Sequence, residues 1–269
     1  MDSKTAAEAA TLLGLDDPPP VETINTDGRS SAVLVCDHAS NRVPERLGSL
    51  GLDQRVLTEH IGWDWGAADV ARRLSAHLDA PLVLSGYSRL VIDCNRPLDH
   101  AESITERSAG VSIPGNLTLS PPERSIRIDA LFHPYHDTIV ELLNRRSQRP
   151  TLLISIHSFS PILNGQLRPW HIGISHWRDP RLAALLLGAL RRTADYTIGD
   201  NKPYPIENNI DYTIPRHSEG RELPSVMIEI RQDGILTESG AAAWAARLAQ
   251  AHRQVESEIL RLFGSSFET

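Results

Sequence analysis

Short apolar runs alternate with longer amphipathic stretches along most of the chain. The runs are rich in branched aliphatic residues and are bounded by turn-forming or charged residues, which predicts buried strands. They cover residues 32–36, 82–84, 90–92, 152–156, 172–174 and 226–230. Because consecutive rather than alternate positions are apolar, we expect these strands to be covered on both faces.

Apolar residues recur with helical spacing in the longer stretches. These predicted helices cover residues 64–78, 121–146, 180–192 and about 238–263. Pro134 is expected to kink or split the second helix, since proline cannot donate a backbone hydrogen bond. Pro180 suits the first turn of the third helix, and Thr237 suits the N-cap of the last.

The order of these elements predicts an α/β fold with three layers, helix on sheet on helix, around a mostly parallel or mixed central sheet. Residues 1–20 end in three consecutive prolines and are expected to form an N-terminal arm. We expect residues 21–269 to form a single domain, because no linker-like segment divides them.

Composition narrows the class of protein. Of the 269 residues, 41% are hydrophobic, which is enough for a core without disulfides. The formal net charge of −7 argues against a protein that coats nucleic acid. The two cysteines, Cys36 and Cys94, have no metal-binding or disulfide-framework spacing. With no apolar run of membrane-spanning length and no signal-peptide pattern, we expect a cytoplasmic protein without a membrane partner. The oligomeric state stays open.

Polar residues that suit catalysis follow or lie within the predicted strands. They are Asp37-His38, Asn95-Arg96, His157-Ser158, and Glu229 with Arg231. Ligands of α/β sheets bind beyond the carboxyl ends of the strands, so these residues are expected to converge. Histidines with carboxylates suit a metal-assisted hydrolase, in which zinc keeps one position open for water and a free carboxylate is the general base.

Each of these residues also has a structural interpretation. A histidine at a strand end often only forms a hydrogen bond to a loop. In the corresponding interpretation of Arg96, this residue is a solvated loop residue. Glu229 has a possible structural partner in Arg231, and Asp64 is equally suited to capping the helix that follows it. No Gly-x-Ser-x-Gly elbow or phosphate-binding glycine loop occurs, which disfavours a serine hydrolase and a nucleotide enzyme.

Five stretches spread over residues 30–235 carry a resemblance to a known family. They are VCDHASNRVP (35–44), HIGWDWGAADVARRL (60–74), YSRLVIDCNRP (87–97), SIHSFSP (155–161) and MIEIRQD (227–233). In combination they resemble the N-formylglutamate amidohydrolase family. That family is similar in its core to zinc carboxypeptidases and succinylglutamate desuccinylases, so the resemblance implies a zinc-exopeptidase-like fold.

The resemblance also implies roles for individual residues. His38 and His157 match the two histidine ligands of zinc. Asn95 and Arg96, in the Asp-x-Asn-Arg motif, match the pair that holds a substrate carboxylate. Glu229, in Glu-hydrophobe-Arg, matches the catalytic base.

One position departs from the pattern. The third residue after His38 is Asn41, where the related zinc enzymes have a glutamate ligand. A neutral amide is a poor zinc ligand, so another carboxylate is needed. Asp64 is the preferred replacement, because it lies just before a helix and has no obvious partner, and Glu45 ranks below it.

Arg89 is matched more loosely, and His217 is a candidate from its place just before the Glu229 strand rather than from the resemblance. Arg89 lies near the position at which the related enzymes supply an arginine that polarises the carbonyl. His217 is expected to contact substrate or transition state, or else to be a surface histidine.

The resemblance implies zinc-dependent hydrolysis of N-formyl-L-glutamate, or a similar N-acyl acidic amino acid, to formate and glutamate. For glutamate this is a late step of histidine breakdown. The implied cofactor is one Zn²⁺ per chain, or another divalent metal, and the implied partner is a small-molecule substrate. Two alternatives remain: a carboxypeptidase-like or other N-acyl amino acid hydrolase, and a non-catalytic relative that binds an acidic small molecule.

Overall fold

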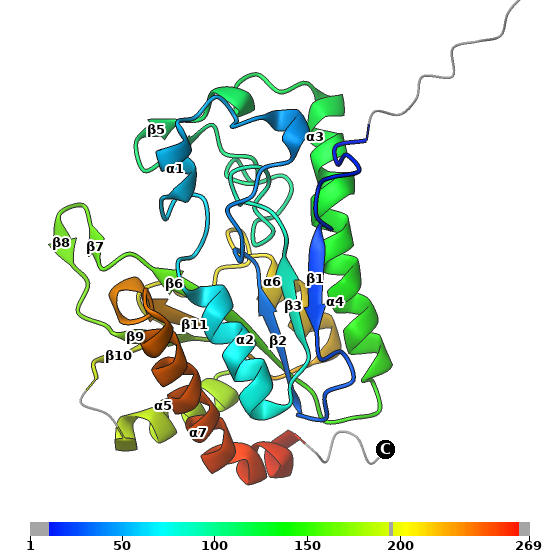
Figure 1. The fold of residues 1–269 in the computed structure, drawn as a ribbon. Coiled ribbons are helices and arrows are strands. Elements are labelled where there is room, and N and C mark those ends of the chain that lie inside the picture. Colours follow the sequence, from blue (N-terminus) through cyan, green and yellow to red (C-terminus); the bar gives the residue numbers. More distant parts are fainter. Residues whose placement is uncertain (1–10, 194–195, 264–269) are drawn as a thin grey trace, which may run out of the picture.

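A seven-stranded sheet forms the centre of the computed structural model, which describes residues 11–193 and 196–263 (Figure 1). The strand order is β1-β3-β2-β6-β11-β9-β10. The strands are β1 (Val21–Ile24), β2 (Ala32–Cys36), β3 (Leu82–Ser85), β6 (Leu152–Phe159), β9 (Ile172–Ser175), β10 (Ile198–Asp200) and β11 (Ser225–Arg231). Two small hairpins lie outside it: β4 (Arg107–Ser108) with β5 (Val111–Ser112), and β7 (Ile162–Leu163) with β8 (Gln166–Leu167).

The sheet is mixed but mostly parallel, as predicted. Neighbouring strands β3, β2, β6 and β11 all run in one direction. Strand β1 pairs antiparallel with β3, while β9 pairs antiparallel with β11 and parallel with β10. The four central strands therefore bring their carboxyl ends to the same edge.

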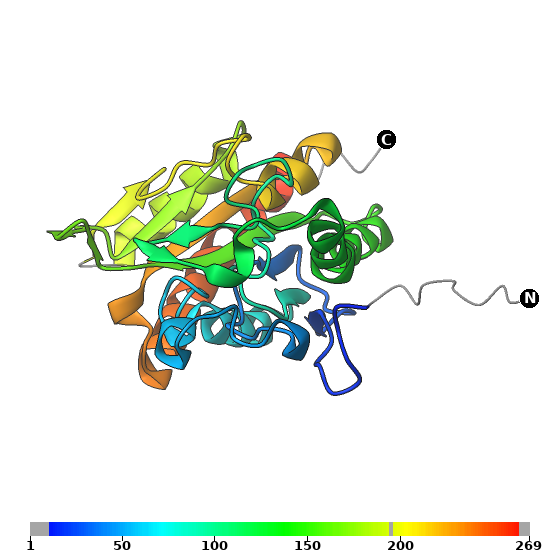
Figure 2. The ribbon, with the colours of Figure 1, turned by 90° about the horizontal axis from the view of Figure 1, so that it is seen from above.

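Helices cover both faces of the sheet and complete the three predicted layers (Figures 1 and 2). One face packs against α2 (Ala67–Leu78), α5 (Arg181–Thr193) and α7 (Glu238–Phe263), and the other against α4 (His133–Arg145) and α6 (Thr213–Ser218). Successive residues of β2 alternate between the two cores, which is why its whole run is apolar.

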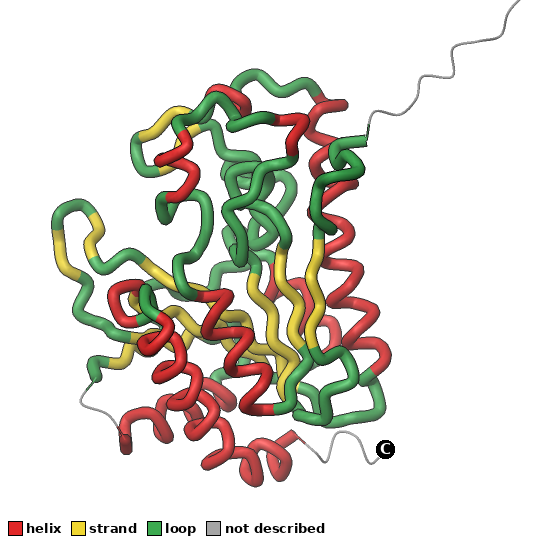
Figure 3. The backbone as a smooth tube through the Cα atoms, in the orientation of Figure 1, coloured by secondary structure: helices red, strands yellow, loops and turns green. Residues whose placement is uncertain are grey.

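A further part of the chain, outside the three layers, lies above the carboxyl edge of the sheet and consists mainly of loops (Figure 3). It contains α1 (Gln54–Thr58), α3 (Pro121–Arg127) and the β4–β5 hairpin, and it has its own apolar cluster. Short helical turns complete the chain: Glu45–Leu47, Pro114–Asn116, Glu219–Arg221 and Gln232–Gly234, with a π-helix at Ile128–Phe132. No helix within the described residues is long and apolar enough to span a bilayer.

The predicted strand at 90–92 is wrong. Its residues are buried in this upper cluster but lie in turns. The Asn116 amide nitrogen donates to the Leu90 carbonyl at 2.8 Å, and Arg127 Nη1 donates to the Val91 carbonyl at 3.0 Å. Side-chain donors thus satisfy backbone oxygens that a strand would have paired.

The other element boundaries differ less. The predicted helix 121–146 is split into α3, the π-helix and α4, with Pro134 in the first turn of α4. Strand β1 was not predicted, and it forms one edge of the sheet beside β3. The expected arm lies partly outside the described residues, so its boundary stays a prediction.

Candidate active site and metal centre

The register of three neighbouring strands brings the polar residues together. Strand β6 is longer than predicted, so His157 lies within it rather than after it. Glu229 of β11 pairs directly with His157. Val35 of β2 pairs with Ser155, so Asp37, two residues further on, lies level with His157.

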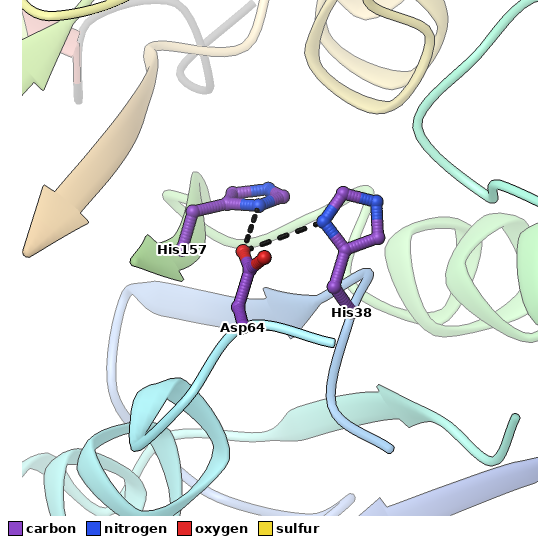
Figure 4. A group of neighbouring side chains, drawn as sticks. All are labelled: His38, Asp64 and His157. Atoms are coloured by element: carbon purple, nitrogen blue, oxygen red, sulfur yellow. Dashed lines mark hydrogen bonds and ion pairs between the residues drawn. The ribbon is translucent and has the colours of Figure 1, made fainter. Parts of the chain in front are cut away.

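Asp64 reaches the same place from the loop before α2. Gly66 caps that helix with a left-handed backbone, φ +75°, and a Cβ there would lie 2.4 Å from the Ile235 carbonyl oxygen. The Asp64 backbone N–H donates to the His38 carbonyl at 3.0 Å. Its side chain makes no cap hydrogen bond to α2 and is directed at the histidines instead (Figure 4).

His38, Asp64 and His157 form a buried cluster (Figure 4). The Asp64 Oδ2 atom lies 2.9 Å from His157 Nδ1 and 3.3 Å from His38 Nδ1. One ligand atom from each residue lies within 4.8 Å of the others. Of the three candidates for the third ligand, Asp64, Asn41 and Glu45, the structure therefore brings only Asp64 to the histidines: the Asn41 amide donates to the Leu57 carbonyl, and Glu45 is exposed.

A carboxylate also faces the far nitrogen of each ring. Asp93 Oδ1 lies 2.7 Å from His38 Nε2, and Asp37 Oδ2 lies 2.8 Å from His157 Nε2. Without metal, both nitrogens of each ring therefore donate to carboxylates. Burial lowers the pKa of His157, but hydrogen bonds to Asp37 and Asp64 raise it well above its usual value. For His38, burial and Arg89 lower the pKa, yet Asp93 and Asp64 raise it overall.

These groups fit a zinc ion. Two histidines and one carboxylate are the protein ligands of many catalytic zinc sites. A zinc-binding histidine usually donates its other N–H to a carboxylate, and both rings have that partner in place.

Arg89 lies between this cluster and a neighbouring cavity of about 250 Å³. Its Nη2 atom lies 2.6 Å from Asp93 Oδ2, and its Nη1 atom lies 3.7 Å from Asp64 Oδ1. Burial lowers the pKa of Arg89, but these two carboxylates raise it overall. The structure therefore holds a cation next to the candidate metal centre.

Glu229 is buried and has an oxygen, Oε2, without a hydrogen-bond partner within the described part of the chain. Burial raises the pKa of Glu229 to about 7, although nearby His157 lowers it. The alternative partner, Arg231, turns away and pairs with Asp233 at 2.8 Å. Such a carboxyl suits a general base, which must accept and release a proton near neutral pH.

Asn95 and Arg96 lie near the site but already have protein partners. The Asn95 side chain accepts from the backbone N–H groups of Tyr212 and Thr213 and donates to Asp211 at 3.0 Å. Arg96 lies 3.3 Å from Glu102 and 3.7 Å from Asp211.

His217 is buried, so it is not a surface histidine. Its Nε2 lies 2.9 Å from His136 Nδ1, and His136 Nε2 donates to the Cys94 carbonyl. His217 Nε2 is therefore the donor, which leaves its Nδ1 as a buried acceptor without a partner in the described chain. Burial lowers the pKa of His136 to about 4 and that of His217 to about 3.

The sequence analysis gave no role to the outer carboxylates Asp37 and Asp93. Asp37 also accepts hydrogen bonds from Tyr135, Ser155 and Thr213, at 3.0, 2.9 and 2.6 Å. The signals were present, since Asp37 precedes His38 and Asp93 opens the Asp-x-Asn-Arg motif. However, Asp37 serves the distant His157, which only the strand register reveals.

A mostly parallel α/β sheet with a buried His-Asp-His set and a separate buried carboxyl at its carboxyl edge is the arrangement expected of a metal-assisted hydrolase. A sequence model described as "FGase: N-formylglutamate amidohydrolase" matches residues 30–236. The chain belongs to this N-formylglutamate amidohydrolase family and is therefore a hydrolase that acts on an amide.

Individual relatives agree with this assignment. N-formylglutamate deformylase from Pseudomonas aeruginosa is 27% identical over 255 residues, covering 87% of this chain and 92% of that protein. A solved gene product from Agrobacterium tumefaciens is 38% identical with a TM-score of 0.89, covering 92% of this chain and 99% of that one. N-formylglutamate amidohydrolase from Ralstonia eutropha shares the fold at 18% identity, with a TM-score of 0.67 over 91% and 99% of the two chains.

Proposed function

We propose that the protein hydrolyses the formyl amide of N-formyl-L-glutamate, or of a closely similar N-acyl acidic amino acid, to formate and the free amino acid. The observation that carries this proposal is the buried cluster of His38, Asp64 and His157 beside the buried carboxyl of Glu229, whose Oε2 atom has no hydrogen-bond partner among the described residues. The named activity of the Pseudomonas relatives supports the choice of substrate. With glutamate as product, the reaction is a late step of histidine breakdown.

Zinc, one ion per chain, would be held by His38 Nδ1, His157 Nδ1 and a carboxylate oxygen of Asp64. When bound, zinc lowers the pKa of water and polarises a carbonyl. Asp93 and Asp37 would keep both rings oriented with their Nδ1 atoms toward the ion.

Glu229 takes the proton of the attacking water on its free oxygen and later delivers it to the nitrogen of the leaving amine. Water thereby adds to the formyl carbon, the C–N bond breaks, and the base returns to its starting state. Arg89 supplies positive charge for the oxyanion that develops on the carbonyl oxygen. Its contacts with Asp93 and Asp64 hold it in place for this role.

Asn95 and Arg96 hold a carboxylate of the substrate, as their motif implies, and we assign them the α-carboxylate. Arg96 must then exchange its contact with Glu102 for the substrate, which is feasible because the Glu102 side chain is 61% exposed. The free Nδ1 of His217 contacts the substrate or the transition state as an acceptor.

The test is formate release from N-formyl-L-glutamate by zinc-loaded protein, compared with the Glu229→Gln variant. The wild type should turn over, while Glu229→Gln should keep its zinc and lose about 10²- to 10⁴-fold in kcat. Replacing the exposed Glu222 in the same way controls for loss of a negative charge. An active Glu229→Gln enzyme removes Glu229 as the base. Binding without formate release supports the non-catalytic alternative, and turnover of other N-acyl amino acids alone changes the substrate.

A further inference from the structure

The cavity beside Arg89 is the feature that the proposed reaction leaves unused. Its volume of about 250 Å³ lies just below the usual range for drug-sized ligands, so it suits part of a small metabolite. Arg89 and Asp93 form its wall toward the candidate metal centre, and Arg107 of the β4–β5 hairpin forms part of another wall. His38, Asp64, His157 and Glu229 do not line the cavity, but Arg89 and Asp93 contact this cluster as well as the cavity. A substrate group that reaches past Arg89 from the metal centre would therefore enter this space.

The charges that line the cavity are unevenly partnered. Asp93 pairs with Arg89 and His38, and the other carboxylate, Glu102, pairs with Arg96. Arg107 has no carboxylate partner among the residues that the structure describes. Its only side-chain hydrogen bond there runs from Nη1 to the Gly110 carbonyl at 3.0 Å. The remaining titratable group of the lining, His60, is exposed and contacts the ring of Trp65.

The backbone of Arg107 is fixed even though its side chain is exposed. The Thr105 hydroxyl donates to the Arg107 carbonyl at 2.7 Å, and the Arg107 N–H donates to the Thr105 Oγ1 atom at 3.3 Å. The β4–β5 pairing holds the hairpin from the other side, with Arg107 opposite Ser112. The guanidinium therefore starts from an anchored position and can present its planar donors to a carboxylate.

We propose that Arg107 binds the side-chain carboxylate of the substrate and so sets the preference for acidic over neutral N-acyl amino acids. This inference rests on the proposed function. Arg96, whose two carboxylate neighbours are Glu102 and Asp211, serves the α-carboxylate, and Arg107 supplies the second cation that a dicarboxylic substrate needs. The neutral analogue N-formyl-L-glutamine has no such group for Arg107 to bind.

The experiment compares kcat/KM for N-formyl-L-glutamate and N-formyl-L-glutamine in zinc-loaded wild type and Arg107→Gln. We expect Arg107→Gln to lower the value for the acid by about 10- to 100-fold, as for loss of a charged hydrogen-bonded contact, and to change the amide by less than about threefold. Arg107→Lys should recover part of the loss, because the charge remains but the fork of donors does not. Arg55→Gln, at an exposed arginine of α1, is the matched control.

Equal effects on both substrates, or no effect on either, would overturn the role of Arg107 while leaving the hydrolase assignment intact. If the wild type releases no formate from either substrate, the proposed function fails, and calorimetry then decides the inference. In that case, binding of N-formyl-L-glutamate at least about tenfold weaker to Arg107→Gln supports the site, and equal binding overturns it.

Discussion

Replacing Asp37 tests whether the outer carboxylates prepare the candidate metal centre. Its Oδ2 atom faces His157 Nε2 and the Ser155 hydroxyl, and its Oδ1 atom faces the hydroxyls of Tyr135 and Thr213. In Asp37→Asn the amide oxygen must face His157, because the ring nitrogen is a donor. The amide nitrogen then faces two hydroxyls that can rotate to accept. The variant therefore keeps its shape and loses only the charge.

The magnitude follows from this geometry. Removing an outer partner of a zinc ligand typically costs about 10- to 100-fold in metal affinity, or about 1.4–2.7 kcal/mol. Asp37→Asn keeps a neutral hydrogen bond to His157, so we expect a loss near tenfold. Asp37→Ala removes the bond and should approach a hundredfold. Asp129→Asn, whose side chain is 71% exposed, should leave the affinity unchanged.

The assay is zinc affinity by competition with a chelator over a pH series. Asp37 also raises the pKa of His157, and a proton competes with zinc for its Nδ1. Wild-type affinity should therefore fall more steeply than that of Asp37→Asn as the pH is lowered, so the gap narrows toward low pH. The reasoning would be refuted if folded Asp37→Asn bound zinc as tightly as the wild type at high pH. It would also be refuted if the difference in zinc affinity between the two proteins did not change with pH.

Two further predictions concern the third ligand and the histidine pair. Asp64→Ala should lower zinc affinity by about a hundredfold or more, since about 10–16 kcal/mol shared among the four ligands of a structural zinc site is about 2.5–4 kcal/mol each. Asn41→Ala should keep the metal, and elemental analysis showing the reverse would move the ligand to Asn41. The folded pKa values of about 4 for His136 and about 3 for His217 lie below the unfolded value near 6.5. The stability that the neutral pair contributes is therefore present above about pH 6.5 and is lost as the pH falls, by about 1.4 kcal/mol per pH unit for each histidine. Urea unfolding of His217→Gln should show a weaker loss between pH 6.5 and 4, and a slope identical to that of wild type would contradict the assignment.

The sheet was predictable because its strands are covered on both faces. Residues 32–36 and 226–230 are apolar at nearly every position, and each lies between two helical layers. The same pattern misled at residues 90–92, where the burial is real but Asn116 and Arg127 take the place of a partner strand. An apolar run therefore indicates that its residues are buried. Whether its backbone pairs with another strand depends on residues that are distant in the sequence.

The site was predictable for residues that follow strands in the sequence, such as His38. The grouping of Asp64 with the histidines depends instead on the tight turn at Gly66, and the partner of His157 depends on the register between β2 and β6. The sequence could not predict that Asn95 and Arg96 bind protein partners, because those partners, Asp211 and Glu102, lie in loops with no periodic pattern.

The balance of charge around His38 and His157 would let one arrangement suit the protein both without a metal and with the proposed zinc ion. Without metal, the carboxylates Asp37, Asp64 and Asp93 face Arg89 and two histidines whose pKa values are raised, so three negative charges meet three positive ones. Zinc would take the two Nδ1 positions that carry protons in that state, so one dication would replace two protons and the net charge of these groups would stay unchanged. A buried site that changed its net charge on binding would incur a large desolvation cost. The outer carboxylates Asp37 and Asp93 thus hold the two rings in the orientation that the proposed zinc ion would need.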